Sequence, residues 1–369
     1  MTFLLDARTG RRPTGIANYT FALAREFGAL APDDVRPICH RRHARAMSRL
    51  GLRPYAAAAG DLEASRLPAA SVAHGPNYRP LEHGAAGKVV TIHDLGFLTL
   101  PECHPAGMPE RLDAIMRSSA GTVDMFVCVS RDTRDALLDA YDVESERCTV
   151  VHNGVDSKRF RPLDGAPRSR VLRWRYRLER PYALFVGAMV PRKDLVTLLE
   201  AFRRIAPSHP ELDLVVAGNK TRRWASDWPR VKRWLAEHPE VRRRVRVLDY
   251  VPDRDMPDLY GHSSVVTLTS LLEGFGMTIL EGLACERPVV ATRTGAVPEV
   301  GQDAIYYGDV RDPDSIAAAL GAALADEDGD RRRRRAAEIV AEHSWRRTAE
   351  QTLDVYRLVA GRRTTAAGA

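Results

Sequence analysis

The chain has 369 residues, of which 44% are hydrophobic and 28% charged, and its formal net charge is +7. This length predicts two domains, because a domain usually takes roughly 100–200 residues. The composition excludes a disordered or collagen-like chain. The net charge is small for the length, so it is compatible with anionic ligands such as phosphates without demanding nucleic acid.

The five cysteines lie far apart, and no Cys-X-X-Cys pair occurs among them. A structural zinc site is therefore not expected, and the wide spacing suits a reducing compartment. The opening MTFLLDARTG has too short an apolar run for a signal peptide, and no stretch reaches the about 18 apolar residues of a membrane-spanning helix. We therefore expect a cytoplasmic protein.

The first half of the chain alternates short apolar runs with helical patterns. Strands are expected at 3–7, 35–39, 71–75, 88–94, 125–130 and 148–153. A helix is expected from Gly15, because apolar residues recur after it at spacings of three and four, and two more cover 111–120 and 131–141. Because the strand segments are continuously apolar, they predict parallel strands that are buried on both faces.

The pattern restarts after a charged stretch, 157–180, which we interpret as a linker with a short helix. Strands are expected at 182–187, 212–218, 245–250, 264–270, 287–292 and 304–308. Asp194 is expected to cap the next helix. Further helices are expected at 256–262, 278–285, 313–325 and 345–359, followed by a frayed tail. The prediction is an α/β protein with two doubly wound domains, whose ligands bind in loops that follow the strands.

The strongest local motif is EGFGMTILE, residues 273–281, which follows a strand and opens a helix. Its glycines let the backbone approach a ligand, and the amides of Gly276, Met277 and Thr278 at the helix start favour an anion. Glu273 and Glu281 are the acids at the two ends of this motif. One of them can accept hydrogen bonds from a ribose diol, and the other can face a sugar. The alternative is an ordinary glycine-rich turn with solvated acids.

Three weaker motifs also follow or precede expected strands and helices. Arg192 and Lys193 lie just before a helix and suit a diphosphate, although a surface charge pair is the commoner outcome. His93 and Asp94 end a strand, where the histidine can bind a substrate hydroxyl or simply belong to the core. Gly15 begins a helix and either lets the backbone approach a ligand or only opens that helix.

Taken together, these motifs resemble the retaining glycosyltransferases of the GT-B class, in particular family 4, the glycosyl transferases group 1. The resemblance extends over nearly the whole chain. It rests on the order and spacing of the Gly15 loop, His93-Asp94, CVSRDT (128–133), VVHNGVD (150–156), FVGAMVPRKD (185–194), the segment 273–281 and GAVPEV (295–300).

The resemblance implies a fold and a domain arrangement. A GT-B protein has two Rossmann-like doubly wound domains that face each other across a cleft. An N-terminal acceptor domain is expected at 1–165 and a donor domain that binds the nucleotide sugar at 175–345. The C-terminal helix, within 346–369, is expected to cross back to the N-terminal domain.

The resemblance also implies roles for single residues. His93 and Glu273 are expected to act at the reacting sugar. The other expected contacts are Arg192, Lys193, Gly15, Gly276, Met277 and Thr278 with the donor diphosphate, Asp94, Gly274 and Phe275 with the sugar, Glu281 with the ribose, and Asn219, Tyr250 and Val251 with the nucleobase. Neither a metal nor a resident cofactor is expected, because the nucleotide sugar is a co-substrate and the cations replace a metal.

The activity implied is transfer of a hexosyl group with retention at the anomeric carbon. The donor is GDP-mannose or a UDP- or dTDP-hexose, and the acceptor is a hydroxyl of a glycan or a lipid-linked sugar. A small-molecule acceptor, as in antibiotic glycosylation, is the alternative. Many relatives carry Leu-Pro in place of Met277-Thr278 and Gly in place of Glu286, which weakens any inference about the sugar.

Other function classes fit the sequence less well. A dinucleotide-dependent oxidoreductase is disfavoured, because RPTGIAN stands where Gly-X-Gly-X-X-Gly would follow the first strand. The five arginines at 331–335 lie among acids and indicate a solvated face rather than a nucleic-acid site. The basic tract 40–53 leaves a peripheral membrane contact open, whereas a non-catalytic basic binder of nucleic acid or membrane is disfavoured.

Overall fold

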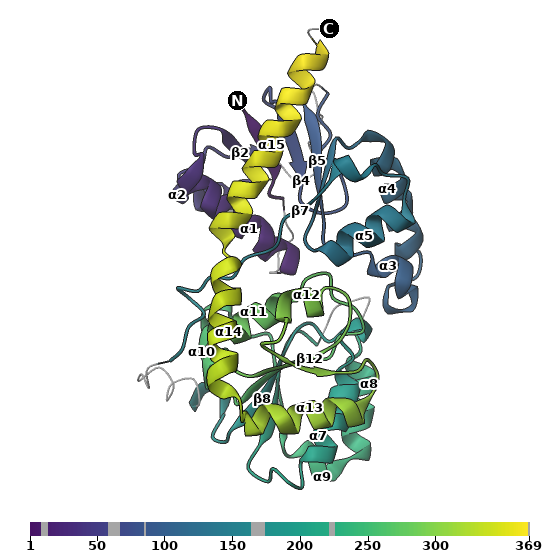
Figure 1. Ribbon diagram of the computed structural model, residues 1–369, viewed down its shortest axis with the longest axis vertical. Coiled ribbons are helices and arrows are strands. Elements are labelled where there is room, and N and C mark those ends of the chain that lie inside the picture. The colour runs from purple at the N-terminus through teal and green to yellow at the C-terminus, as the bar shows by residue number, and fades with distance from the viewer. Residues whose placement is uncertain (9–13, 58–66, 85, 164–173, 221–225, 368–369) are drawn as a thin grey trace. The chain divides into compact units, whose positions relative to one another are not determined.

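The computed structural model describes residues 1–8, 14–57, 67–84, 86–163, 174–220 and 226–367. The chain forms two compact units, which are described separately (Figure 1). Unit 1 comprises Met1–Leu98, Gly107–Gly154 and Trp345–Ala369, and unit 2 comprises Thr99–Ala106 and Val155–Ser344. The assignment of acceptor and donor roles to domains with the boundaries given above stays a prediction.

Within the described residues, unit 1 contains a seven-stranded sheet in the order β3-β2-β1-β4-β5-β6-β7. Every strand pair in it is parallel. The strands are β1 Phe3–Asp6, β2 Val35–His40, β3 Tyr55–Ala57, β4 Val72–Gly75, β5 Gly87–Ile92, β6 Met125–Cys128 and β7 Cys148–Val150. The helices are α1 Gly15–Leu30, α2 Arg41–Arg49, α3 Gly96–Thr99, α4 Met108–Thr122, α5 Arg131–Ala140 and α15 Trp345–Ala367.

The two faces of this sheet are covered by different helices. Val90 and Ile92 of β5 pack in a core with α4 and α5. Alternate side chains of a strand point to opposite faces, so Thr91 lies on the other face, where α1 and α15 contact the sheet. Both faces are therefore buried, which is why the strands of this unit read as continuous apolar runs.

Helix α15 confirms the expected C-terminal helix that joins the N-terminal unit (Figure 1). Its Tyr356 is fully buried against Phe3 and Phe27, with ring centroids 5.2 and 5.9 Å apart. A Cβ on Gly87 would lie 2.3 Å from Val359, so α15 packs directly on the backbone of β5. The expectation of a frayed tail after residue 359 was wrong, because the helix continues to Ala367.

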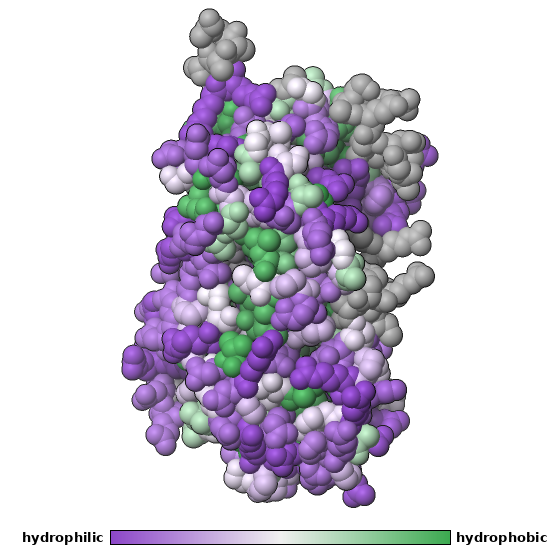
Figure 2. Space-filling view, turned by 90° about the vertical axis from the view of Figure 1, so that its right-hand side faces the viewer, coloured by the Kyte–Doolittle hydropathy of each residue, from purple (hydrophilic) through white to green (hydrophobic). Residues whose placement is uncertain are grey.

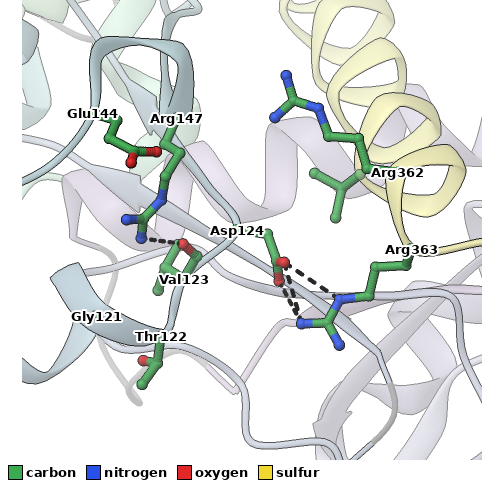
Figure 3. Close-up of a pocket in the computed structure, with 9 residues that line it drawn as sticks. Gly121, Thr122, Val123, Asp124, Glu144, Arg147, Arg362 and Arg363 are labelled. Atoms are coloured by element: carbon green, nitrogen blue, oxygen red, sulfur yellow. Dashed lines mark hydrogen bonds and ion pairs between the residues drawn. The ribbon is translucent and has the colours of Figure 1, made fainter. Parts of the chain in front are cut away.

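The far end of α15 is held beside the start of β6, where Figure 3 shows Arg363 next to the carboxylate of Asp124. Arg363 forms an ion pair with Asp124, the residue before β6, at 3.0 Å. Arg147 donates to the carbonyl of Ala120 at 2.6 Å, beside a hollow of about 460 Å³. This end of α15 therefore ties the helix to unit 1 but lies away from the loops that follow the strands.

Unit 2 contains, within the described residues, a six-stranded sheet in the order β10-β9-β8-β11-β12-β13. Its pairs are also all parallel. The strands are β8 Tyr182–Val186, β9 Asp213–Ala217, β10 Val245–Asp249, β11 Val265–Leu268, β12 Val289–Thr292 and β13 Tyr306–Gly308. The helices are α7 Leu195–Ile205, α8 Trp228–Glu237, α9 Pro239–Arg242, α10 Met256–His262, α11 Met277–Ala284, α12 Val297–Gly301, α13 Pro313–Ala325 and α14 Gly329–Glu342.

Asp194 is the N-cap residue of α7, as expected, but its side chain does not accept a hydrogen bond from a backbone amide of the helix. Its backbone is left-handed, with φ of 42°. Its carboxylate instead accepts a hydrogen bond from the hydroxyl of Thr197 at 2.7 Å. The residue therefore reverses the chain between the short 3₁₀ turn Pro191–Lys193 and α7.

The surface agrees with the composition of the chain. On the face drawn in Figure 2 most side chains are hydrophilic, and hydrophobic residues reach the surface in small groups. Among the described residues, the large exposed hydrophobic side chains are Met1, Leu98, Trp174, Tyr250 and Leu358. No helix that the structure describes has both the length and the apolar character needed to span a bilayer.

Candidate functional site

The carboxyl ends of the neighbouring strands β8 and β11 carry the charged residues of the main candidate site. Arg192 and Lys193 lie in the turn that follows β8, and Glu273 lies in the loop that follows β11. The two strands pair directly, so their following loops meet at one edge of the sheet. The backbone joins them further, because Leu271 N donates to Arg192 O at 2.8 Å.

Glu273 is the centre of this charged cluster. Its side chain is 9% exposed and forms an ion pair with Lys193, while Arg192 Nη1 lies 3.7 Å from its other oxygen. Ser270 donates a hydrogen bond to the same carboxylate. Burial alone would raise the pKa of Glu273, but the attraction of Lys193 and Arg192 and the hydrogen bonds from Lys193 and Ser270 outweigh it and lower the pKa to about 2. Glu273 is therefore ionised at neutral pH.

The two cations keep part of their surface exposed. The side chain of Arg192 is 22% exposed and that of Lys193 is 16% exposed. They share one carboxylate, so the cluster carries a net positive charge. Arg192 also donates to the carbonyl of Leu272, which fixes the guanidinium beside the loop after β11. The cluster thus presents preorganised positive charge to an anion.

The start of α11 adds backbone donors beside the cluster. Gly276 is the N-cap residue of α11, with φ of 92°, a conformation that glycine adopts without strain. The amides of Met277 and Thr278 belong to the first turn, where the helix dipole favours negative charge. Phe275 is buried, so the stretch between Glu273 and α11 offers mainly its backbone to a ligand.

Glu281 lies further along α11, where its carboxylate accepts a hydrogen bond from Tyr260. Tyr260 is fully buried and packs edge-on against Phe160, with ring centroids 5.4 Å apart. Burial raises the pKa of Glu281 to about 7, and the hydrogen bond from Tyr260 and the charge of Arg159 offset only part of this rise. Glu281 is therefore an acid whose charge changes near neutral pH.

The residues expected at the nucleobase lie at the same edge of the unit 2 sheet. Asn219 follows β9, and its carbonyl accepts from Met189 N at 3.3 Å. A Cβ on Gly218 would lie 1.6 Å from the carbonyl of Gly187, so the ends of β8 and β9 are in close contact. After β10, Tyr250 is 56% exposed and Val251 is buried.

The other expected residues lie in unit 1. His93 follows β5 and donates from Nε2 to the carbonyl of Pro76 at 2.9 Å. Burial lowers the pKa of His93, although the carbonyl of Pro76 and the charge of Asp94 oppose this, so the ring is neutral at pH 7. Asp94 accepts from Gly96 N at 3.0 Å and thereby orders the start of α3. Gly15 is the first residue of α1.

The structure thus groups the expected site residues in two sets. Unit 2 brings together Arg192, Lys193, Glu273, the start of α11 and Glu281, with the nucleobase set on the same sheet edge. Unit 1 carries His93, Asp94 and Gly15. The sequence did not single out Ser270 or Tyr260, the hydrogen-bond partners of the two acids, since a serine or tyrosine in an apolar segment carries no motif signal.

Comparison with known proteins assigns the family. Residues 172–340 match the family model described as glycosyl transferases group 1, and residues 13–159 match the model described as glycosyltransferase family 4. The O-antigen chain mannosyltransferase B of Escherichia coli is 30% identical over 290 residues, which cover 78% of this chain and 74% of that protein. The chain belongs to glycosyltransferase family 4.

Two more comparisons bear on this family 4 glycosyltransferase. A D-inositol 3-phosphate glycosyltransferase of Salinispora tropica is 34% identical over 245 residues, covering 63% of this chain and 50% of that protein. The solved structure of Anabaena Alr3699/HepE in complex with UDP and glucose matches with a TM-score of 0.77 at 14% identity, covering 96% and 99% of the two chains. The fold is therefore GT-B, with two parallel-sheet Rossmann-like domains, as expected.

Gly295 gives a direct test of how the glycosyltransferase holds Glu273. Gly295 has φ of 50°, and a Cβ there would lie 2.3 Å from the carbonyl of Glu273, which accepts from Ala296 N at 2.9 Å. We expect Gly295→Ala to destabilise the fold by roughly 1–3 kcal/mol, because the loop of Glu273 must move. The midpoint temperature of thermal unfolding and kcat should both fall. Gly321→Ala in α13, where a Cβ meets nothing within 4 Å, is the control that should keep kcat and should not lower the unfolding midpoint.

Proposed function

We propose that this glycosyltransferase is a retaining hexosyltransferase that uses a nucleotide-diphosphate sugar as donor and needs no metal. The observation that carries the proposal is the cluster at the ends of β8 and β11. There, one buried carboxylate, Glu273, holds two partly exposed cations beside the start of α11. Such a cluster suits a ligand that brings both phosphate charge and a sugar.

The leaving group requires the positive charge. When the bond between the anomeric carbon and the phosphate oxygen breaks, its electron pair stays on the diphosphate. Arg192, Lys193 and the first amides of α11 then stabilise that charge, as fixed donors do at other sites of developing charge. The ionised Glu273 lies beside the sugar, where it favours the positive charge that develops at the anomeric carbon.

The new bond forms between the acceptor oxygen and the anomeric carbon. For retention we propose attack from the face that the diphosphate leaves, with the acceptor proton passing to an oxygen of the leaving phosphate. His93 contacts the sugar near the reacting centre. Its Nε2–H is committed to the carbonyl of Pro76, so Nδ1 of the neutral ring is the acceptor for a sugar hydroxyl.

The donor and acceptor are proposed from chemistry and similarity. Similarity to an O-antigen mannosyltransferase supports a mannosyl donor such as GDP-mannose, with a UDP- or dTDP-hexose as the alternative. Glu281 would accept hydrogen bonds from the ribose, and Asn219, Tyr250 and Val251 would face the base. The acceptor would be a glycan or lipid-linked sugar hydroxyl, with a small natural product as the alternative.

Contact with a membrane surface is a further part of the proposal. In α2 only Met47 is buried, and the helix carries four arginines, Arg41, Arg42, Arg45 and Arg49. A basic, mostly exposed helix suits an anionic lipid surface that presents a lipid-linked acceptor.

The test is a thermal unfolding series with GDP, UDP, ADP and dTDP in a buffer that contains EDTA. A nucleoside diphosphate at about 100 times its dissociation constant stabilises the native state by about 2.7 kcal/mol, which corresponds to roughly 4 °C in Tm. We expect one of the four to produce this shift, and its sugar form to be hydrolysed or transferred. No shift with any of them, or a shift that requires a divalent metal, would contradict the proposal.

A further inference from the structure

The inference concerns the buried polar groups behind His93 in unit 1. Four fully buried side chains form a continuous hydrogen-bonded chain: Tyr19 on α1, Thr91 on β5, His74 on β4 and Tyr356 on α15. The hydroxyls of Tyr19 and Thr91 are 3.0 Å apart, Thr91 Oγ1 is 2.8 Å from His74 Nε2, and His74 Nδ1 is 2.6 Å from the hydroxyl of Tyr356. This arrangement is called the buried chain below.

The buried chain is directional and fully paired. Burial lowers the pKa of His74 to about 3, so the ring is neutral and has one N–H and one acceptor nitrogen. It must therefore donate to one neighbour and accept from the other, and both of its nitrogens have partners. A fully paired polar network in a core fixes one arrangement of its members, because any change leaves a buried polar group unpaired.

The buried chain ends at the ring that supports His93. The ring of Tyr19 lies edge-on against His93, with centroids 4.9 Å apart and an interplanar angle of 87°. Thr91, which holds the hydroxyl of Tyr19, is two residues before His93. Residues two apart in an extended strand point to the same face, so Tyr19 is fixed at its hydroxyl by Thr91 and meets His93 with its ring.

Helix α15 also contacts the buried chain. The ring centroids of Tyr19 and of Trp345, at the start of α15, are 6.0 Å apart. Tyr356, further along α15, is the last member of the buried chain. Thr348 also donates to the carbonyl of His152 at 2.8 Å. Helix α15 therefore contacts both ends of the buried chain.

We propose that Tyr19 is a positioning residue for His93, and that Thr91, His74 and Tyr356 hold Tyr19 in place from β5, β4 and α15. The inference rests on the proposed role of His93 at the reacting sugar. Its consequence is that the hydroxyl of Tyr19, which touches neither donor nor acceptor, sets kcat through the orientation of the His93 ring. Misplacing a catalytic group by a small distance lowers rates strongly.

The experiment compares Tyr19→Phe and Thr91→Val with a matched control. Tyr141→Phe removes another buried tyrosine hydroxyl of unit 1, which donates to Asp113 at 2.9 Å away from His93. We expect both test variants to lower kcat about tenfold, while the affinity for nucleoside diphosphate stays unchanged, because its proposed site lies in unit 2. Tyr141→Phe should lower Tm by a similar amount and leave kcat unchanged.

A second readout does not depend on activity. The ¹⁵N chemical shifts of the His93 ring report its tautomer and hydrogen bonding, and they are assigned with His93→Gln. We expect them to move in Tyr19→Phe and Thr91→Val but not in Tyr141→Phe. The double variant should be no worse than Thr91→Val alone, because Thr91→Val already removes the contact between the hydroxyls of Thr91 and Tyr19.

The outcomes separate this inference from the proposed function. If His93→Gln keeps full kcat, the role proposed for His93 is wrong, and the inference is wrong with it. If His93→Gln is impaired while Tyr19→Phe and Thr91→Val match Tyr141→Phe in kcat and in ring shifts, only the inference is overturned.

Discussion

Lys193→Met is expected to lower kcat/KM about 1000-fold, since the loss of one fixed donor at a developing charge costs about that much in other enzymes. Methionine keeps an unbranched side chain up to the ε position and removes the ammonium group. The nucleoside diphosphate should then also lose most of its stabilising effect on thermal unfolding. The control is Lys232→Met on the exposed side of α8, which should leave both values unchanged.

A second effect of Lys193→Met comes from the partner left behind. Glu273 is buried, and the low pKa that Lys193 helps to maintain would rise, so the variant should lose about 3 kcal/mol of stability. Lys193→Met with Glu273→Gln should recover most of this loss, because no unpaired charge remains, but should stay inactive. If the double variant recovered activity together with Tm, Lys193 would be a structural partner of Glu273 and not a ligand of the diphosphate.

The linkage to pH gives an independent check of the same ion pair. Glu273 has a pKa depressed from 4.5 to about 2, so its contribution to stability is present above about pH 4.5 and is lost as the pH falls towards 2. In Lys193→Met this part of the acid dependence should shrink. Chemical denaturation at a series of pH values between 2 and 6 measures it.

Much of the fold followed from the sequence because parallel strands buried on both faces leave a local signature. The run FLLDA contains β1, and the pattern after Gly15 matches α1, which Thr14 caps by accepting from Ala17 N at 3.2 Å. The strand at 287–292 was expected two residues too early, since Arg287 and Pro288 precede β12. Boundaries of this kind depend on pairing with β11, which lies outside the local sequence.

The candidate site was predictable from the sequence only for residues that have suitable chemistry and also lie in a recognisable motif. From the sequence, Arg192, Lys193 and Glu273 could be placed only in the loops that follow two strands. The structure shows that they form one ion-pair cluster. The buried chain was not predictable, because Tyr19 and Tyr356 are distant in sequence and each reads as an ordinary core position. Partners of buried polar groups are set by packing, which no local pattern records.

Glu281→Gln is expected to make the enzyme more stable at pH 8 and weaker in nucleotide binding. The pKa of Glu281 is raised from 4.5 to about 7, so the native state holds its proton more tightly than the unfolded chain does. By linkage, stability is greatest below about pH 4.5 and falls as the pH rises towards 7, by at most about 3 kcal/mol from this group. Glutamine stays neutral and should remove that fall.

Nucleotide binding should change in the opposite direction. In the proposed site the ribose hydroxyls would donate to Glu281 best when it is ionised, so we expect affinity for the nucleoside diphosphate to rise with pH through about 7 in the native enzyme. Glu281→Gln should bind about tenfold more weakly at pH 8, because a charge-assisted hydrogen bond becomes a neutral one. Since the phosphate groups also titrate in this range, the comparison with Glu281→Gln isolates the carboxylate.

The two measurements together show whether Glu281 lowers the stability of the empty enzyme and strengthens nucleotide binding. Denaturation and calorimetric titration at pH 5, 6, 7 and 8 supply both curves, and Glu237→Gln on the exposed surface of α8 should reproduce the native curves. If Glu281 binds the ribose, this half-buried acid beside Tyr260 lowers the stability of the empty enzyme, and the ribose hydroxyls compensate for that loss when the nucleotide binds. Equal nucleotide affinity in Glu281→Gln at pH 8 would show instead that the ribose lies elsewhere, and that the acid serves only the packing between α10 and α11.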